Sequence, residues 1–161
     1  MTTMKIISTI FLLCLFTFAS GQNGSKKTIA ENYKTKQYNC AIFPSTFIDL
    51  PPIGSTDGFT PTHADIDKAE LALKNKLADL TKDNPRIFNN LKHYRRQYLG
   101  FKNKEGQRIL IINCLRTKDE DIIKNWLDKF IMPLDGGDNY WNINYNLDTN
   151  TLFDLSVNGD A

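Results

Sequence analysis

The residue types that most often carry catalysis are sparse in this sequence. It has 2 histidines, His63 and His93, and neither stands at a spacing typical of metal ligands, such as H-x-x-x-H. The chain also contains no C-x-x-C pair, G-x-S-x-G elbow, P-loop or dinucleotide fingerprint. The sequence therefore predicts no metal site, no cofactor and no catalytic centre.

One group of side chains has the chemistry of a binding surface. Tyr94, Arg96 and Tyr98 alternate in a segment with the period of a β-strand, so they share one face. An arginine between two aromatic rings can stack on a ligand and can pair with a carboxylate, a phosphate or a sugar. We predict a ligand-binding surface here, with Trp141 as a further aromatic contact; the alternative is a solvated strand face.

Two other polar groups favour a plain structural role. Asn142, Asn144 and Asn146 alternate with apolar residues, and such amides can bind sugar hydroxyls, but an exposed strand face explains them equally well. Residues 135–139 offer oxygens for calcium, yet they lack the central glycine and closing glutamate of an EF-hand loop. We interpret that segment as a turn between strands.

Cys40 and Cys114 are candidates for a disulfide, because an exported chain reaches an oxidising compartment. A bridge between them would close a loop of roughly 75 residues and stabilise the fold by about 4 kcal/mol. In the alternative, Cys114 is a small buried apolar residue within a strand. Both interpretations remain open at the level of sequence.

The first 21 residues have the pattern of a secretory signal peptide. Lys5 precedes an apolar run over residues 6–18, and Ala19-Ser20-Gly21 provides the small residues of a cleavage site. The run is too short to be a permanent membrane span. We expect a secreted or periplasmic protein for which the membrane matters only in export. A lipid anchor on Cys14 is disfavoured, because no small residue precedes that cysteine.

The composition is that of an ordinary single-domain protein, with 41% hydrophobic and 24% charged residues among 161. The formal net charge is only +2, which argues against a broad surface for nucleic acid. We assign residues 22–37 to a flexible leader and residues 38–161 to one domain. Within that domain, residues 38–61 are rich in proline and should form an extended segment that packs on the rest.

The element that organises this domain is an amphipathic helix over residues 62–82, about 30 Å long by its rise per residue. Thr62 should cap it with Asp65 in the first turn, and Glu70 and Lys74 should form an exposed pair. Its apolar stripe comprises Ile66, Ala69, Leu73, Leu77 and Leu80.

The C-terminal half has the two-residue period of strands. Residues 94–101 and 108–115 should form a hairpin, and the second strand is apolar on both parities, so it must be covered on both faces. Residues 141–147 and 153–157 should be outer strands with one wet face each. Residues 118–129 predict a helical turn, followed by a strand over 130–134.

These elements predict an α+β fold, in which one long helix packs on a curled antiparallel sheet of four or five strands. The outline resembles the cystatin-like folds, although the QxVxG loop is absent. The segments YRRQYLGF (94–101), INC (112–114), LDGG (134–137) and VNG (157–159) resemble a family of small uncharacterised secreted bacterial proteins. That resemblance covers residues 62–161 and implies no activity.

Together these features predict a secreted, non-catalytic module that binds a protein, a peptide or a small ligand on its sheet face or edge. One alternative is a small secreted hydrolase whose acid and base are dispersed, with His93, Asp135 and Asp154 as candidates. Another is a structural component of the cell envelope that dimerises through an apolar patch.

Overall fold

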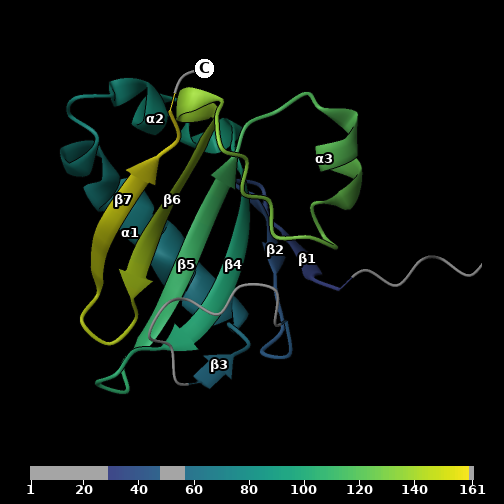
Figure 1. The fold of residues 1–161 in the computed structure, drawn as a ribbon. Coiled ribbons are helices and arrows are strands. Elements are labelled where there is room, and N and C mark those ends of the chain that lie inside the picture. The colour runs from purple at the N-terminus through teal and green to yellow at the C-terminus, as the bar shows by residue number, and fades with distance from the viewer. Residues whose placement is uncertain (1–28, 48–56, 160–161) are drawn as a thin grey trace, which may run out of the picture.

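The computed structural model describes residues 29–47 and 57–159, and in this part seven strands join into one mixed sheet (Figure 1). The strand order is β1-β2-β4-β5-β6-β7, and β3 also pairs with β4. The strands are β1 (Glu31–Lys34), β2 (Asn39–Ile42), β3 (Asp57–Phe59), β4 (Arg95–Lys102), β5 (Arg108–Leu115), β6 (Tyr140–Asn146) and β7 (Thr151–Val157).

The prediction of one long helix on an antiparallel sheet of four or five strands is wrong. The sheet has seven strands and is mixed, because β2 runs parallel to β4. The additional strands β1, β2 and β3 have only 4, 4 and 3 residues, too few to show a clear alternation in sequence. β2 and β3 form because β4 offers a long edge, on which Cys40 pairs with Arg96 and Asp57 with Lys102, and β1 then pairs with β2. β1 falls within residues 22–37, which the sequence had assigned to a leader.

Three α-helices and two 3-10 helices accompany the sheet in the described residues, and only one has more than six residues. No helix among the described residues is long and apolar enough to cross a membrane. The helices are α1 (His63–Leu80), α2 (Pro85–Asn89), α3 (Glu120–Asn125), η1 (Leu91–His93) and η2 (Gly137–Asn139).

The long helix predicted from the sequence is confirmed as α1. Thr62 caps it by accepting a hydrogen bond from the Asp65 backbone N–H at 3.2 Å, and the Asp65 carboxylate accepts one from the Thr62 N–H at 3.1 Å. Figure 1 shows α1 crossing one face of the sheet. Four residues of the predicted stripe are fully buried there, whereas Leu80 is 45% exposed. The four are Ile66, Ala69, Leu73 and Leu77.

The opposite face of the sheet carries a second, smaller apolar cluster, so the prediction that β5 is covered on both faces is confirmed. The cover comes from Phe43 after β2 and from Trp126 and the irregular residues that follow α3. The strand predicted over residues 130–134 is therefore wrong. Partly buried Ile122, Leu127, Phe130 and Ile131 pack against this cluster.

Two buried amides hold the irregular residues 126–131 on that face. The Gln97 Nε2 donates to the carbonyl oxygens of Trp126 at 2.6 Å and of Lys129 at 2.7 Å, and its Oε1 accepts from the Ile131 N–H at 2.8 Å. Asn113 donates to Gln97 Oε1 at 2.9 Å and to the Ile131 carbonyl at 2.6 Å. These bonds replace the sheet ladder that an irregular segment lacks.

Candidate functional site

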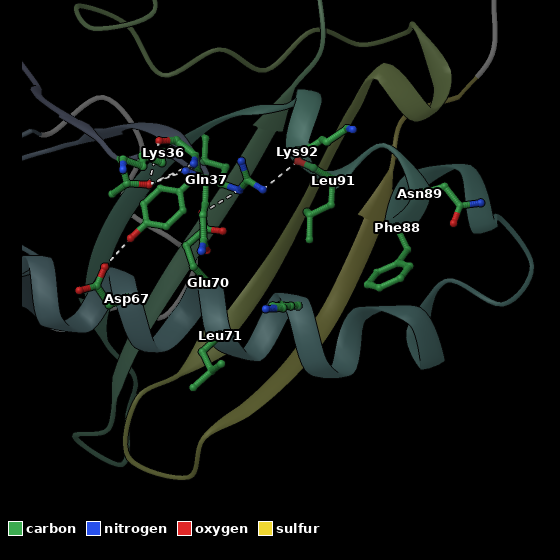
Figure 2. A pocket seen from close by; sticks show the side chains of 13 residues that line it. Lys36, Gln37, Asp67, Glu70, Leu71, Phe88, Asn89, Leu91 and Lys92 are labelled. Atoms are coloured by element: carbon green, nitrogen blue, oxygen red, sulfur yellow. Dashed lines mark hydrogen bonds and ion pairs between the residues drawn. The ribbon is translucent and has the colours of Figure 1, made fainter.

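A pocket of about 800 Å³ lies between the β1–β2 hairpin, α1 and the chain from α2 to β4 (Figure 2). That volume lies within the range of small-ligand sites, about 300–1,000 Å³. The hairpin turn contributes residues 35–38, α1 contributes Asp67, Glu70, Leu71 and Lys74, and the remaining wall comprises Phe88, Asn89, Leu91, Lys92 and Arg96.

The floor of the pocket is a buried ion pair. The Arg96 Nε lies 2.7 Å from Glu70 Oε1, and the two side chains are only 2% and 10% exposed. The Arg96 guanidinium also donates to the carbonyl oxygens of Tyr94 and Leu91, each at 2.8 Å. The Tyr98 hydroxyl donates to the same Glu70 oxygen at 2.8 Å. Arg96 is therefore held in one orientation, and Glu70 is held through one of its two oxygens.

Burial and charge shift the pKa values of all three groups at this floor. Burial raises the pKa of the Glu70 carboxyl, and the Arg96 charge opposes that shift. Burial alone would lower the pKa of Arg96, but the charges of Glu70 and, to a smaller extent, of Cys114, Tyr98 and Cys40 together outweigh it, and the net pKa is raised. Burial and then the Glu70 charge raise the pKa of Tyr98 well above its usual value. Tyr98 therefore stays a neutral donor and Arg96 stays a cation.

The hairpin wall of the pocket is attached to α1 by polar and aromatic contacts. The Asp67 carboxylate accepts hydrogen bonds from the hydroxyls of Tyr38 and Tyr33, the latter at 3.3 Å. The His63 ring stacks on Tyr33 with ring centroids 3.9 Å apart, and its Nε2 lies 2.6 Å from Glu31 Oε1. Burial and Asp67 raise the pKa of Tyr38. These contacts fix the distance between the hairpin turn and α1.

The rim of the pocket is cationic and partly apolar. Lys36, Lys74 and Lys92 are exposed, and none has an ion-pair partner among the residues that the structure describes. Arg96 compensates the charge of Glu70, so Asp67 is the only uncompensated carboxylate that lines this pocket. Leu71 adds a side chain that is 58% exposed. The pocket thus combines a net positive rim with an apolar wall.

The four side chains predicted to bind a ligand are all buried. Tyr94, Tyr98 and Trp141 are 2%, 0% and 1% exposed and lie under α1, and only Arg96 lines the pocket. The Tyr94 hydroxyl donates to the Asp138 carbonyl at 2.6 Å, and its ring packs edge-on against Trp141. The strand alternation placed them on one face, and that face points inward. Ligand binding by the three aromatic residues stays a prediction.

Both candidate disulfide cysteines are buried free thiols in the structure. Cys40 is on β2 and Cys114 is on β5, and each lies opposite Arg96 of the intervening strand β4. The two cysteines are therefore two strands apart. Two inter-strand spacings amount to about 9.5 Å between Cα atoms, whereas a disulfide requires less than about 7 Å. Burial raises the pKa of Cys40 to about 12 and raises that of Cys114 as well.

The residues proposed for a dispersed hydrolase site do not line this pocket. His93 is in η1, and Asp135 lies beside Asn158, whose side chain donates to the Asp135 carbonyl at 3.1 Å. Asp154 is four residues before Asn158, a distance of about 13 Å along β7. Within the described residues, no group of three His, Cys, Asp or Glu side chains is placed to hold a metal ion.

Glu70 is the site residue that the sequence analysis misassigned, since it was predicted to pair with Lys74 at the surface. It follows Ile66 by four residues and precedes Leu73 by three, so it borders the buried stripe of α1. That position was the available signal. The contribution of residues 35–38, Phe88 and Leu91 had no local signal, because it depends on how distant segments meet.

Comparisons of the chain with protein-family models, with curated proteins and with solved structures give no match. The resemblance to small secreted bacterial proteins therefore stays a prediction. Inferences about function rest on the geometry of the pocket.

Proposed function

We propose that this chain is a secreted, non-catalytic module that binds a peptide or a small ligand in the pocket between the β1–β2 hairpin, α1 and residues 88–92. One observation carries the proposal: a fixed floor of Glu70 and Arg96 lies beneath an open rim of lysines and a half-exposed leucine. Preorganised polar groups beside apolar walls are the usual make-up of a ligand site. Export rests on the signal-peptide pattern of residues 1–21.

The pocket is a better candidate than the edges of the sheet. β1 has 4 residues, and the N–H of Ala30, next to it, already donates to the Leu127 carbonyl. β7 has a bulge, where Asp154 and Leu155 lie opposite Ile143, and Asp154 has a φ of 53°. Short strands, bulges and edge charges disfavour the addition of a further strand.

The polar groups of the pocket stabilise one another instead of activating a nucleophile. The Thr35 hydroxyl is engaged with the backbone of Gln37 and Tyr38, and Glu70 is engaged with Arg96 and Tyr98. A general base must instead reach a proton on a substrate or a nucleophile. This arrangement supports recognition over chemistry.

The test is a screen of peptides and small molecules by two-dimensional NMR on the isotope-labelled protein. Ligands of the pocket should shift the amide resonances of Leu71, Lys74 and Leu91. The Leu71→Ala variant should lower the affinity for these ligands about threefold to tenfold, because it loses apolar contact. Leu80→Ala is the matched control, because Leu80 is an exposed leucine on α1 that does not line the pocket. The proposal fails if ligands perturb only other surfaces, or if the two variants behave alike.

A further inference from the structure

The floor of the pocket offers one fixed hydrogen-bond acceptor. Glu70 Oε1 accepts the hydrogen bond of the Tyr98 hydroxyl and forms the ion pair with Arg96, whereas Oε2 makes no hydrogen bond or ion pair with the described residues. The side chain is 10% exposed and lines the pocket. A bound ligand that covers this oxygen without donating to it would leave a desolvated acceptor unpaired. Because Arg96 already compensates the charge, a neutral N–H donor suits Glu70 better than a second cation.

The rim above this acceptor favours an anion. Lys74 follows Glu70 by one helical turn, a rise of about 6 Å, and both residues line the pocket. Lys36 and Lys92 add positive charge from the hairpin and from η1. At the rim an ammonium group can hold a carboxylate while both stay partly hydrated, which avoids most of the desolvation cost.

An apolar wall lies next to these two polar positions. Leu71 on α1 and Phe88 and Leu91 on the segment from α2 to η1 all line the pocket (Figure 2). Leu71 is 58% exposed, and Phe88 and Leu91 are partly buried against the main core. An aliphatic side chain placed between them would remove apolar surface from water on both sides.

We infer that the pocket takes the carboxyl terminus of a peptide whose last residue is apolar, an inference that rests on the proposed binding function. The amide N–H of that residue donates to Glu70 Oε2, its side chain packs between Leu71 and Leu91, and its carboxylate pairs with Lys74. These three groups belong to a single residue of the ligand. Their receptors, Glu70, Leu71 and Lys74, likewise lie within one turn of α1.

The test uses four small probes, of which one carries all three groups and each of the others lacks one. N-acetyl-L-leucine is the complete probe, N-acetyl-L-leucinamide lacks the charge, 4-methylpentanoate lacks the N–H donor, and N-acetylglycine lacks the side chain. Each is titrated by NMR into the purified protein. The complete probe should shift the amides of Glu70, Leu71 and Leu91. The other three should bind at least about threefold more weakly, and 4-methylpentanoate about tenfold.

A variant separates the carboxylate contact from general affinity. Lys74→Gln should weaken N-acetyl-L-leucine about threefold, as expected for an exposed ion pair, and should leave N-acetyl-L-leucinamide unchanged. Lys124→Gln is the control, because Lys124 is in α3 and does not line the pocket. Glu70 itself is left intact, since it also holds Arg96 in place.

The possible failures point to different conclusions. If N-acetyl-L-leucinamide, N-acetylglycine or 4-methylpentanoate binds in the pocket as tightly as N-acetyl-L-leucine, the ligand is not a peptide carboxyl terminus with an apolar last residue that is held by all three contacts, and the inference is overturned, although the pocket remains a binding site. If N-acetyl-L-leucine perturbs no pocket amide, the inference is likewise overturned. The broader proposal then stands or falls on the ligand screen with Leu71→Ala and Leu80→Ala.

Discussion

At the scale of single residues, Arg96 connects the sheet to α1 and to the pocket. It lies between Cys40 and Cys114 on neighbouring strands, beneath Glu70, so a guanidinium occupies a row that is otherwise apolar. Such a cation is tolerated only when a carboxylate and carbonyl groups satisfy it. Its main role in the fold is thus to hold Glu70 and the Leu91 backbone at the pocket floor.

Removal of the arginine alone should be strongly destabilising. Arg96→Met leaves the Glu70 carboxylate buried without its cation and with only the Tyr98 hydrogen bond, and we expect the free energy of unfolding to fall by about 3–5 kcal/mol. In the double variant Arg96→Met/Glu70→Leu no buried charge remains, so most of that loss should be recovered. Urea unfolding at pH 7 measures both. Equal destabilisation of the single and double variants would show that the pair contributes net stability beyond charge compensation.

At the scale of elements, the irregular residues 126–131 cover one face of the sheet, a position that a helix or a further strand usually occupies. Their apolar side chains fill the face of β4 and β5 opposite α1, and their backbone is held by Gln97 and Asn113. An element of this kind has no period of its own. Its position is set by side chains on the strands beneath it.

Gln97→Met keeps the side-chain volume and removes the bonds to Trp126, Lys129 and Ile131. We expect a loss of about 2–4 kcal/mol and faster amide hydrogen exchange in residues 126–131, with α1 much less affected. Asn142→Leu on β6 is the matched control, since the Asn142 side chain makes no comparable bonds to this segment. Uniform acceleration in both α1 and residues 126–131 would argue against a local role for Gln97.

At the scale of the whole molecule, the mixed sheet creates the pocket. The parallel pairing of β2 with β4 brings the hairpin turn, residues 35–38, beside α1. The same pairing places the Cys40 and Cys114 thiols on both sides of Arg96, inside the main core. Because these two thiols are buried, the stability of the protein should vary with pH in the alkaline range.

Stability should fall as the pH rises above about 9. The unfolded thiols lose their protons near pH 9, whereas in the folded protein the pKa of Cys40 is about 12 and that of Cys114 is also raised. The unfolded state therefore binds fewer protons, which favours unfolding by up to about 1.4 kcal/mol per pH unit for each thiol. Chemical unfolding between pH 8 and 10 measures this slope.

The double variant Cys40→Ala/Cys114→Ala is the control for that slope and should show a shallower decline with pH. Since both thiols are free, a reducing agent should leave the stability of the unmodified protein unchanged. A large loss of stability on reduction would instead indicate a disulfide and contradict the register of β2, β4 and β5.

The sequence by itself determined the elements whose signal is local: the capped helix α1, the hairpin β4–β5 and the strands β6 and β7. It also determined that β5 is covered on both faces, because side-chain parity alone requires it. Only the tertiary structure decided that Tyr94, Arg96 and Tyr98 face inward, that Glu70 pairs with Arg96, and that residues 29–47 and 57–59 add strands. Alternation defines which side chains share a face, but only the packing of distant segments defines which face is buried.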